Sequence, residues 1–264
     1  MRIIALANQK GGVGKTTTAV NLATAFAASG KKTILVDFDP QGNASTGLGI
    51  ARADRTPSSY EVLFDPHLAA SALRETAVPG LFILPATDSL AGAEVELVGA
   101  ENAAGRLRAA IRQLPAVDAI FIDCPPSLSL LTLNALVAAD GVLIPLQTEF
   151  YAMEGLSQLL RTVEQVRARQ NPRLDIEGVV LTMYDRRNRL SDLVAADVRA
   201  ALGKRVFETV IPRNVRLSEA PSHGIPALLY DMNCRGSQAY MALAKEMLSG
   251  FSSRSGVSVE AGEG

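Results

Sequence analysis

The sequence predicts a single doubly wound α/β domain, in which a mostly parallel sheet is flanked by helices over residues 1–251. Three observations support this prediction. Apolar runs of strand length recur along the chain, stretches with helical periodicity lie between most of them, and neither a linker nor an internal repeat divides the 264 residues. Continuous apolar strands that alternate with helices are typical of a parallel sheet covered on both faces. The sequence leaves the strand order open.

The elements follow in order along the chain. Apolar runs predict strands at residues 3–7, 33–36, 81–84, 119–122, 142–146 and 179–181. Helical periodicity predicts helices at residues 17–28, 103–114, 128–138 and 155–169, with a last helix at 237–250. The composition predicts a mobile loop at 42–59, a surface excursion at 217–235 and a disordered tail at 252–264.

Composition limits the classes of function. With 48% hydrophobic residues and a net charge of −1, the chain has no global attraction for nucleic acid, so any DNA affinity needs a local basic patch. No apolar run approaches the ~20 residues that span a bilayer. The N-terminus lacks the pattern of a secretory leader, and two cysteines are too few for a disulfide framework. We therefore expect a cytoplasmic protein with no membrane partner.

The segment between the first predicted strand and the first predicted helix has the composition of a phosphate-binding loop. That position is the one that such a loop requires. Its glycines let backbone N–H groups turn toward phosphate oxygens, and the helix presents its positive end. Lys15 would reach the β- and γ-phosphates, and the Thr16 hydroxyl would bind Mg²⁺. The sequence thus predicts ATP and Mg²⁺ at Lys10, Gly11, Gly12, Val13, Gly14, Lys15, Thr16 and Thr17.

Three carboxylates follow two other predicted strands. Asp37 and Asp39 come after the second strand, and Asp123 after the fourth. The C-terminal ends of parallel strands form the ligand side of an open sheet. An aspartate at a strand end is often only a turn former, but together with the phosphate loop these residues predict a catalytic site. We assign Asp123 to the Mg²⁺ shell, Asp39 to orienting the attacking water, and Asp37 to supporting the metal and the loop.

The loop departs from the strict phosphate-loop pattern, because Gln9 stands where that pattern has glycine. The run Lys10-Gly-Gly-Val-Gly-Lys15-Thr16 instead resembles the deviant Walker A loop of the ParA/MinD family of ATPases. The resemblance implies that Lys10 reaches across a dimer interface to the nucleotide of the partner. It therefore implies an ATPase that forms an ATP-dependent homodimer and hydrolyses ATP to ADP and phosphate.

Three further runs, at residues 39–43, 123–127 and 211–224, resemble the chromosome-partition branch of that family, ParA/Soj. The resemblance extends over most of the chain, from Arg2 to about Phe251. It implies that Pro212 and Asn214 contact the adenine of ATP. It also implies a role in chromosome or plasmid partitioning, association with the nucleoid, and a ParB-type partner that stimulates hydrolysis and releases the DNA.

Arginines are frequent in the second half of the chain. Those at residues 161–173 alternate with acidic residues and are interpreted as a solvated helix face, whereas three arginines at 186–189 follow a predicted strand in a short loop. No aromatic residue lies among these three, so phosphate contact without sequence preference is favoured over base stacking. The family resemblance implies DNA binding by Arg187 and Arg216, with Arg186 and Arg189 as weaker candidates.

Alternatives remain open. A ParA-like ATPase that positions a protein cargo, or a MinD-like cell-division ATPase, would share the same nucleotide site. MinD-type relatives bind membrane through a basic amphipathic C-terminal helix, which the Ser-, Gly- and Glu-rich tail does not resemble. An iron-sulfur relative needs two cysteines from each chain, but Cys124 lies inside the carboxylate segment. A metabolic ligase is the third alternative.

Overall fold

The computed structural model describes residues 1–256, with side chains described to residue 251. It contains one sheet of eight strands in the order β3-β4-β2-β5-β1-β6-β7-β8, and only the β3–β4 pair is antiparallel. The strands are β1 (Arg2–Leu6), β2 (Thr33–Asp37), β3 (Arg74–Glu75), β4 (Leu81–Leu84), β5 (Ala119–Asp123), β6 (Gly141–Gln147), β7 (Asp175–Tyr184) and β8 (Val206–Pro212).

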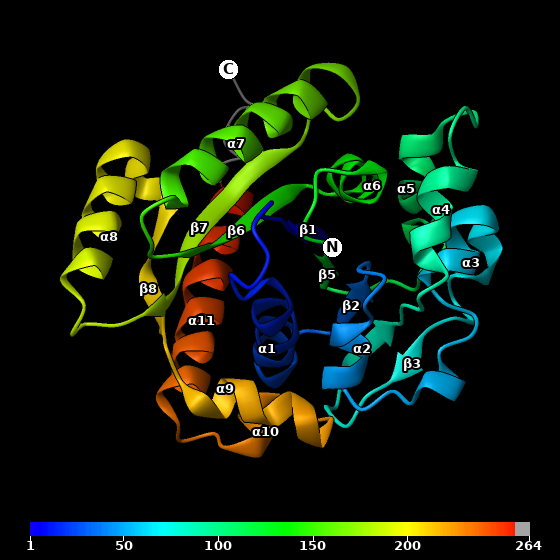
Figure 1. Ribbon diagram of the computed structural model, residues 1–264. Coiled ribbons are helices and arrows are strands. Elements are labelled where there is room, and N and C mark those ends of the chain that lie inside the picture. The colour runs from blue at the N-terminus through cyan, green and yellow to red at the C-terminus, as the bar shows by residue number, and fades with distance from the viewer. Residues whose placement is uncertain (257–264) are drawn as a thin grey trace, which may run out of the picture.

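The helices occupy most connections between these strands, as Figure 1 shows. All five predicted helices are present, with ends that differ by a few residues. The α-helices are α1 (Lys15–Ala28), α2 (Asn43–Gly47), α3 (Ser59–Phe64), α4 (Leu90–Glu96), α5 (Arg106–Ile111), α6 (Leu130–Ala138), α7 (Ala152–Arg169), α8 (Arg189–Leu202), α9 (Val215–Glu219), α10 (Ala227–Tyr230) and α11 (Arg235–Gly256).

Two hydrophobic cores lie on opposite faces of the sheet. One contains buried side chains of α3 to α8, together with strand residues such as Ile34 and Ile122. The other contains side chains of α1, α2, α10 and α11, together with the alternate strand residues such as Leu35 and Phe121. Because successive strand residues point to opposite faces, a strand buried on both sides must be apolar throughout. The predicted doubly wound fold is confirmed.

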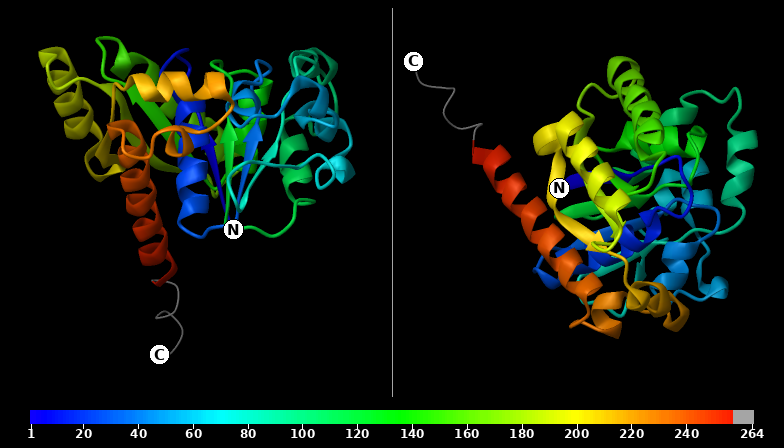
Figure 2. Two further views of the ribbon diagram at one scale, coloured as in Figure 1. Left: turned by 90° about the horizontal axis from the view of Figure 1, so that it is seen from below. Right: turned by 60° about the vertical axis from the view of Figure 1, so that its left-hand side comes forward.

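The parallel strands carry their C-terminal ends to one edge of the sheet. In the left view of Figure 2 the chain starts at the lower edge, and the loops that follow the strands lie at the upper edge with α9 and α10. Strand β5 lies between β1 and β2, and its last residue, Asp123, is the register partner of both Leu6 and Asp37. The phosphate loop and the two aspartates therefore meet at this edge.

Two predictions about irregular segments need correction. Residues 42–59 were expected to be a mobile loop, but they contain α2 and bury Ser45 and Arg55. The excursion at 217–235 contains α9 and α10 and buries Leu217 and Ala227 against the core. The small and polar residues of these segments suggested loops. In the fold, side-chain contacts with residues that are distant in sequence hold both segments in place.

The C-terminal helix is longer than predicted. Helix α11 runs from Arg235 to Gly256, so it includes residues 252–256 of the segment expected to be a disordered tail, and residues 257–264 lie outside the described part of the chain. Across residues 1–256, no helix has both the length and the apolar character that a membrane span requires.

Candidate functional site

The loop between β1 and α1 is shaped by glycines. Gly12 and Gly14 have φ angles of 76° and 86°, a region that side chains with a Cβ rarely occupy. Gly14 is the N-cap of α1, and its carbonyl accepts the first helical hydrogen bond, from the Thr18 amide at 2.8 Å. The loop therefore ends at the positive end of a 14-residue helix, which is the arrangement that attracts phosphate.

Two side chains anchor the loop to the strands beside it. Asn8 donates from Nδ2 to the carbonyl of Pro145 at 2.8 Å, and its Oδ1 accepts from the Lys10 amide at 3.0 Å. The Thr182 hydroxyl of β7 donates to the carbonyl of Val13 at 2.8 Å. Neither anchor was predicted from the sequence. The Asn8 turn has a local signal in its spacing to Lys10, but nothing near Thr182 in sequence indicates its contact.

Lys15 places a cation inside the loop. Its side chain is buried, and Nζ donates to the carbonyl of Lys10 at 3.1 Å. Burial lowers the pKa of Lys15, while the nearby carboxylates of Asp123 and Asp39 raise it in opposition. This ammonium makes no close ion pair among the described residues, so an anionic ligand at the loop would meet an available positive charge.

Asp123 is a buried carboxylate whose two oxygens accept no well-formed hydrogen bond within residues 1–256, although the Thr16 hydroxyl is close enough to act on it. Burial raises its pKa well above the ordinary value, the charge of Asp37 adds to the effect, and Thr16 and Lys15 oppose it. Such a group is costly unless something pairs with it. Mg²⁺ fits this position, because it prefers hard oxygen ligands and is usually held by one or two carboxylates together with substrate phosphates. Thr16 and Asp123 are the residues that would hold it.

Asp37 is also fully buried, but its carboxylate is already bonded. Oδ2 accepts from the amide and the hydroxyl of Ser45, at 2.8 and 2.7 Å. Burial raises the pKa of Asp37 to about 6, against the effect of the Ser45 hydrogen bonds. Asp39 is nearby, and its Oδ1 accepts from the Gln41 amide at 3.0 Å. Asp37 thus fixes α2 to the end of β2. Its Oδ1 accepts a long hydrogen bond from the Asp39 amide at 3.4 Å and is the oxygen that it could offer to a metal shell.

A buried arginine orders the segment that follows Asp39. Arg55 is 5% exposed, and its guanidinium donates to the carbonyls of Gly42 and Ile50 and to the hydroxyl of Thr46, at 2.8 to 3.2 Å. Asp37 is the nearby charge that raises its pKa, although burial has the larger effect and lowers it. Arg55 was not predicted, because its partners become neighbours only when the segment folds.

Lys10 and Gly11 occupy the exposed outer side of the loop. The Lys10 ammonium forms an ion pair with Glu149, which follows β6. Gly11 is exposed, and a Cβ added to it would meet only the Cβ of Pro126, at 4.0 Å. Within one protomer Gly11 therefore has room for a side chain.

The predicted adenine contacts lie beside the arginines. A hollow of about 1140 Å³ is bounded by β7, β8, α9 and α11. Pro212 ends β8, and the Asn214 side chain caps α9 by accepting from the Arg216 amide at 2.9 Å. The residues that matter here are Pro212, Asn214, Arg186, Arg187, Arg213 and Arg235, all of which line the hollow.

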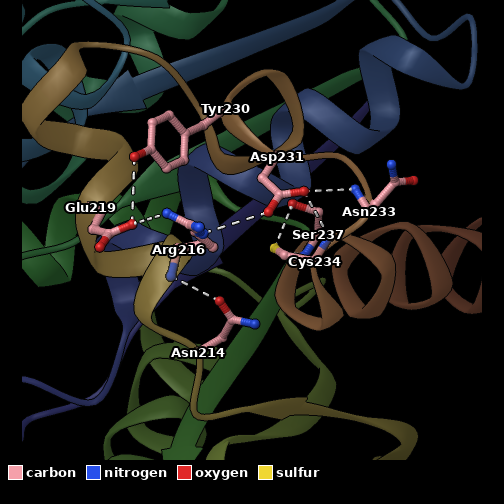
Figure 3. A network of polar contacts seen from close by, with 8 residues as sticks. All are labelled: Asn214, Arg216, Glu219, Tyr230, Asp231, Asn233, Cys234 and Ser237. Carbon is pink, nitrogen blue, oxygen red and sulfur yellow. Dashed lines mark hydrogen bonds and ion pairs between the residues drawn. The ribbon is translucent and has the colours of Figure 1, made fainter.

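The two predicted DNA-binding arginines are exposed but paired with acids. Arg187 bonds to Asp185 through Nε and Nη2, both at 3.1 Å. Arg216 lies between Glu219 and Asp231, as Figure 3 shows. Its guanidinium is 2.8 Å from Glu219, 3.6 Å from Asp231 and 5.9 Å from the ring centre of Tyr230. These pairs raise the pKa of both arginines. A polyanion would have to compete with the carboxylates.

The cysteines do not resemble a cluster site. Cys124 is fully buried, and burial raises the pKa of its thiol. Cys234 lies at the start of α11 and contacts the Ser237 hydroxyl at 3.3 Å. In the part of the chain that the structure describes, no three His, Cys, Asp or Glu side chains gather in a way that could hold a metal ion by themselves.

Comparisons with known proteins agree with this geometry. The family model described as an AAA domain matches residues 1–176. The chromosome partitioning protein ParA of Caulobacter vibrioides is 56% identical over 252 residues, which cover 94% of each chain. The sporulation initiation inhibitor protein Soj of Bacillus subtilis is 53% identical over 247 residues, covering 93% of this chain and 98% of Soj.

A solved structure with the same fold carries a nucleotide. Cobyrinic acid a,c-diamide synthase from Mycobacterium smegmatis, with bound ADP and magnesium, has a TM-score of 0.83 and 37% sequence identity, covering 96% of each chain. That protein has also been solved with an ATP analogue and magnesium. The predicted ligands, ATP and Mg²⁺, thus correspond to the ADP, or the ATP analogue, and the magnesium bound in these structures.

Proposed function

The chain belongs to the ParA/Soj family of chromosome-partitioning ATPases, and from this premise we propose that it is an ATP-dependent DNA-binding switch. In the proposed cycle, ATP and Mg²⁺ bring two protomers together, the dimer binds DNA without sequence preference, and hydrolysis to ADP and phosphate separates them. A ParB-type partner stimulates hydrolysis. The protein acts in the cytoplasm and associates with the nucleoid.

One observation carries the proposal. The phosphate loop presents the buried Lys15 ammonium next to the buried and unpaired carboxylate of Asp123. A site with an available cation for phosphate and an available carboxylate for a metal suits a Mg²⁺-nucleotide better than a neutral ligand. When bound, Mg²⁺ neutralises part of the phosphate charge.

The residues of this chain then have distinct roles. The loop from Lys10 to Thr17 binds the phosphates, and Lys15 neutralises charge that develops on them. Asp39 orients the attacking water, while Asp37 holds the loop and supports the metal shell. Lys10 acts on the nucleotide of the partner, and Pro212 and Asn214 contact the base.

The DNA surface is proposed to include Arg187 and Arg216. One protomer offers few phosphate contacts, because each of these arginines is partly neutralised by an acid. A dimer doubles the number of contacts, which makes binding depend on ATP. Such contacts position a protein on DNA but carry no base information.

The test is co-sedimentation of the protein with DNA of mixed sequence in the presence of ATP, of ADP, and of no nucleotide. Retention with ATP alone is expected. Equal retention in all three conditions, or none in any of them, would contradict the proposal, and the second result would favour an ATPase that positions a protein cargo.

A ligase reaction is the second candidate, because the M. smegmatis protein of similar structure is named as a diamide synthase. Such a reaction consumes ATP only when an acid and an amine donor are present. Phosphate release by the purified protein without either substrate, stimulated by DNA and a ParB-type protein, would exclude it. Strict dependence on a small acid would support it.

A further inference from the structure

Two adjacent aromatic side chains project from the site edge of the sheet into solvent. Phe150 is 74% exposed and Tyr151 is 67% exposed, and their rings meet edge to face with centroids 5.1 Å apart. Single exposed apolar side chains are common. A contacting pair of exposed aromatic rings is less so, because such rings are favoured at protein interfaces.

The turn that presents these rings is fixed on both sides. Thr148 and Ala152 flank them and are buried. The Glu149 amide donates to the carbonyl of Gln147 at 2.9 Å, and the Ala152 amide donates to the carbonyl of Glu149 at 3.0 Å. The rings therefore belong to a defined connection between β6 and α7, and the backbone that carries them has little conformational entropy to lose when they are covered.

The turn is also tied to the nucleotide site. Glu149, the residue before the pair, forms the ion pair with Lys10 of the phosphate loop. The two rings thus continue the exposed surface that carries Lys10 and Gly11. The proposed function already places a second protomer against that surface, so the rings extend a proposed interface and do not form a separate patch.

We propose that Phe150 and Tyr151 form the apolar anchor on which a second copy of this chain docks in the ATP-bound state. The inference rests on the proposed function. In a two-fold dimer both protomers contribute the same surface, so both pairs of rings would be buried in the interface, and buried aromatic residues commonly dominate interface energies. The Lys10 ammonium in this surface is neutralised by Glu149, so the pair offers DNA or an anionic membrane no net attraction.

The test compares dimerisation of the wild type with that of the double variant Phe150→Ser/Tyr151→Ser. Sedimentation velocity with Mg²⁺ and a non-hydrolysable ATP analogue gives the dimer dissociation constant. We expect the double variant to dimerise about 10-fold more weakly or worse. Affinity of the protomer for the analogue and the unfolding midpoint should match those of the wild type, since both rings are exposed.

Two controls make the result specific. Val95→Ser/Val98→Ser removes apolar side chains that are 76% and 77% exposed, on and just after α4, and should leave dimerisation unchanged. Phe150→Leu/Tyr151→Phe keeps apolar area and should restore most of it. The inference is supported if Phe150→Ser/Tyr151→Ser loses dimerisation while both control variants keep it.

Other outcomes separate the inference from the function on which it rests. A wild type that dimerises, with a Phe150→Ser/Tyr151→Ser variant that dimerises equally well, overturns the inference and leaves the proposed function standing. If that variant dimerises but loses DNA, the rings face DNA and the inference is again wrong. If the wild type stays monomeric with the analogue, both fail.

Discussion

Asp37 and Asp123 are register partners in adjacent strands, yet their carboxylates have opposite surroundings. Asp37 accepts two hydrogen bonds from Ser45, whereas both oxygens of Asp123 are unpaired. Burying a charge without partners costs free energy that a metal or a proton would recover. The Asp37 carboxylate is therefore structural, whereas the Asp123 carboxylate is available to a ligand.

This difference predicts stability changes of opposite sign. Asp123→Asn removes a buried carboxylate that accepts no well-formed hydrogen bond, so it should raise the free energy of unfolding of the nucleotide-free protein while weakening its Mg²⁺-dependent affinity for ATP. Asp37→Asn disturbs a satisfied carboxylate and should lower the free energy of unfolding by about 1–3 kcal/mol. Urea unfolding in EDTA measures both. Destabilisation by Asp123→Asn would show that its carboxylate has a partner in solution.

Asp39 supports a different prediction, because its carboxylate contacts only its own loop, at the Gln41 amide. Asp39→Ala should bind ATP and dimerise, but hydrolyse ATP about 100-fold more slowly or worse, since water orientation is lost while the phosphate loop is intact. Single-turnover phosphate release measures this rate. Asp54→Ala, an exposed aspartate, is the matched control. A near-normal rate in Asp39→Ala would move the assignment to Asp37.

Strands and helices were predicted most reliably where their own residues, without distant contacts, determine the type of element. The six strands β1, β2, β4, β5, β6 and β7 were predicted because each contains a continuous apolar run. Strand β8 was missed because Glu208 interrupts its apolar run, and β3 is only two residues long. Helix α8 was not predicted, because charged residues are interleaved with its apolar ones. Val194 and Val198 nevertheless give it a buried face.

The site divides in the same way. The phosphate loop and the aspartates after β2 and β5 could be predicted, because the chemistry and the position are both local in sequence. Arg55 and Thr182 could not, because the partners of Arg55 at Gly42, Thr46 and Ile50 gather around it only when the segment folds, and Val13 is distant from Thr182 in sequence. The segment 42–59 was interpreted as mobile for this reason.

Arg55 predicts that α2 and the turn before it depend on one buried side chain. Arg55→Met leaves the Ile50 carbonyl without its donor and removes one of the donors to the Gly42 carbonyl, so it should lower the free energy of unfolding by about 3 kcal/mol. Hydrogen exchange should rise most at residues 42–50, and ATP turnover should fall. Arg52→Met, on the exposed 3₁₀ turn Arg52–Asp54, is the control. Unchanged protection at residues 42–50 would remove Arg55 from this role.

At the scale of the whole molecule, the net charge of −1 leaves DNA binding to a local surface. Arg187→Glu or Arg216→Glu should weaken binding equally across DNA sequences, with ATP-dependent dimerisation retained. Each lost phosphate contact should reduce the slope of log affinity against log salt by about 0.9. Fluorescence anisotropy across a salt series measures both. Arg161→Glu, on the outer face of α7, should have little effect, and wild-type binding by the Arg187→Glu/Arg216→Glu double variant would place the surface elsewhere.

The Lys10–Glu149 ion pair has a consequence for assembly. In a single protomer Glu149 pairs with Lys10, the lysine proposed to bind the nucleotide of the partner, and so competes with that nucleotide. Two such pairs must open for each dimer. If each exposed pair contributes about 0.5 kcal/mol, the two together weaken dimerisation about 5-fold. Glu149→Gln should therefore dimerise at a lower protein concentration, whereas Glu154→Gln, an exposed acid on α7, should not. Glu149 would then weaken dimerisation of the nucleotide-free protein, so that protomers stay apart until ATP is bound.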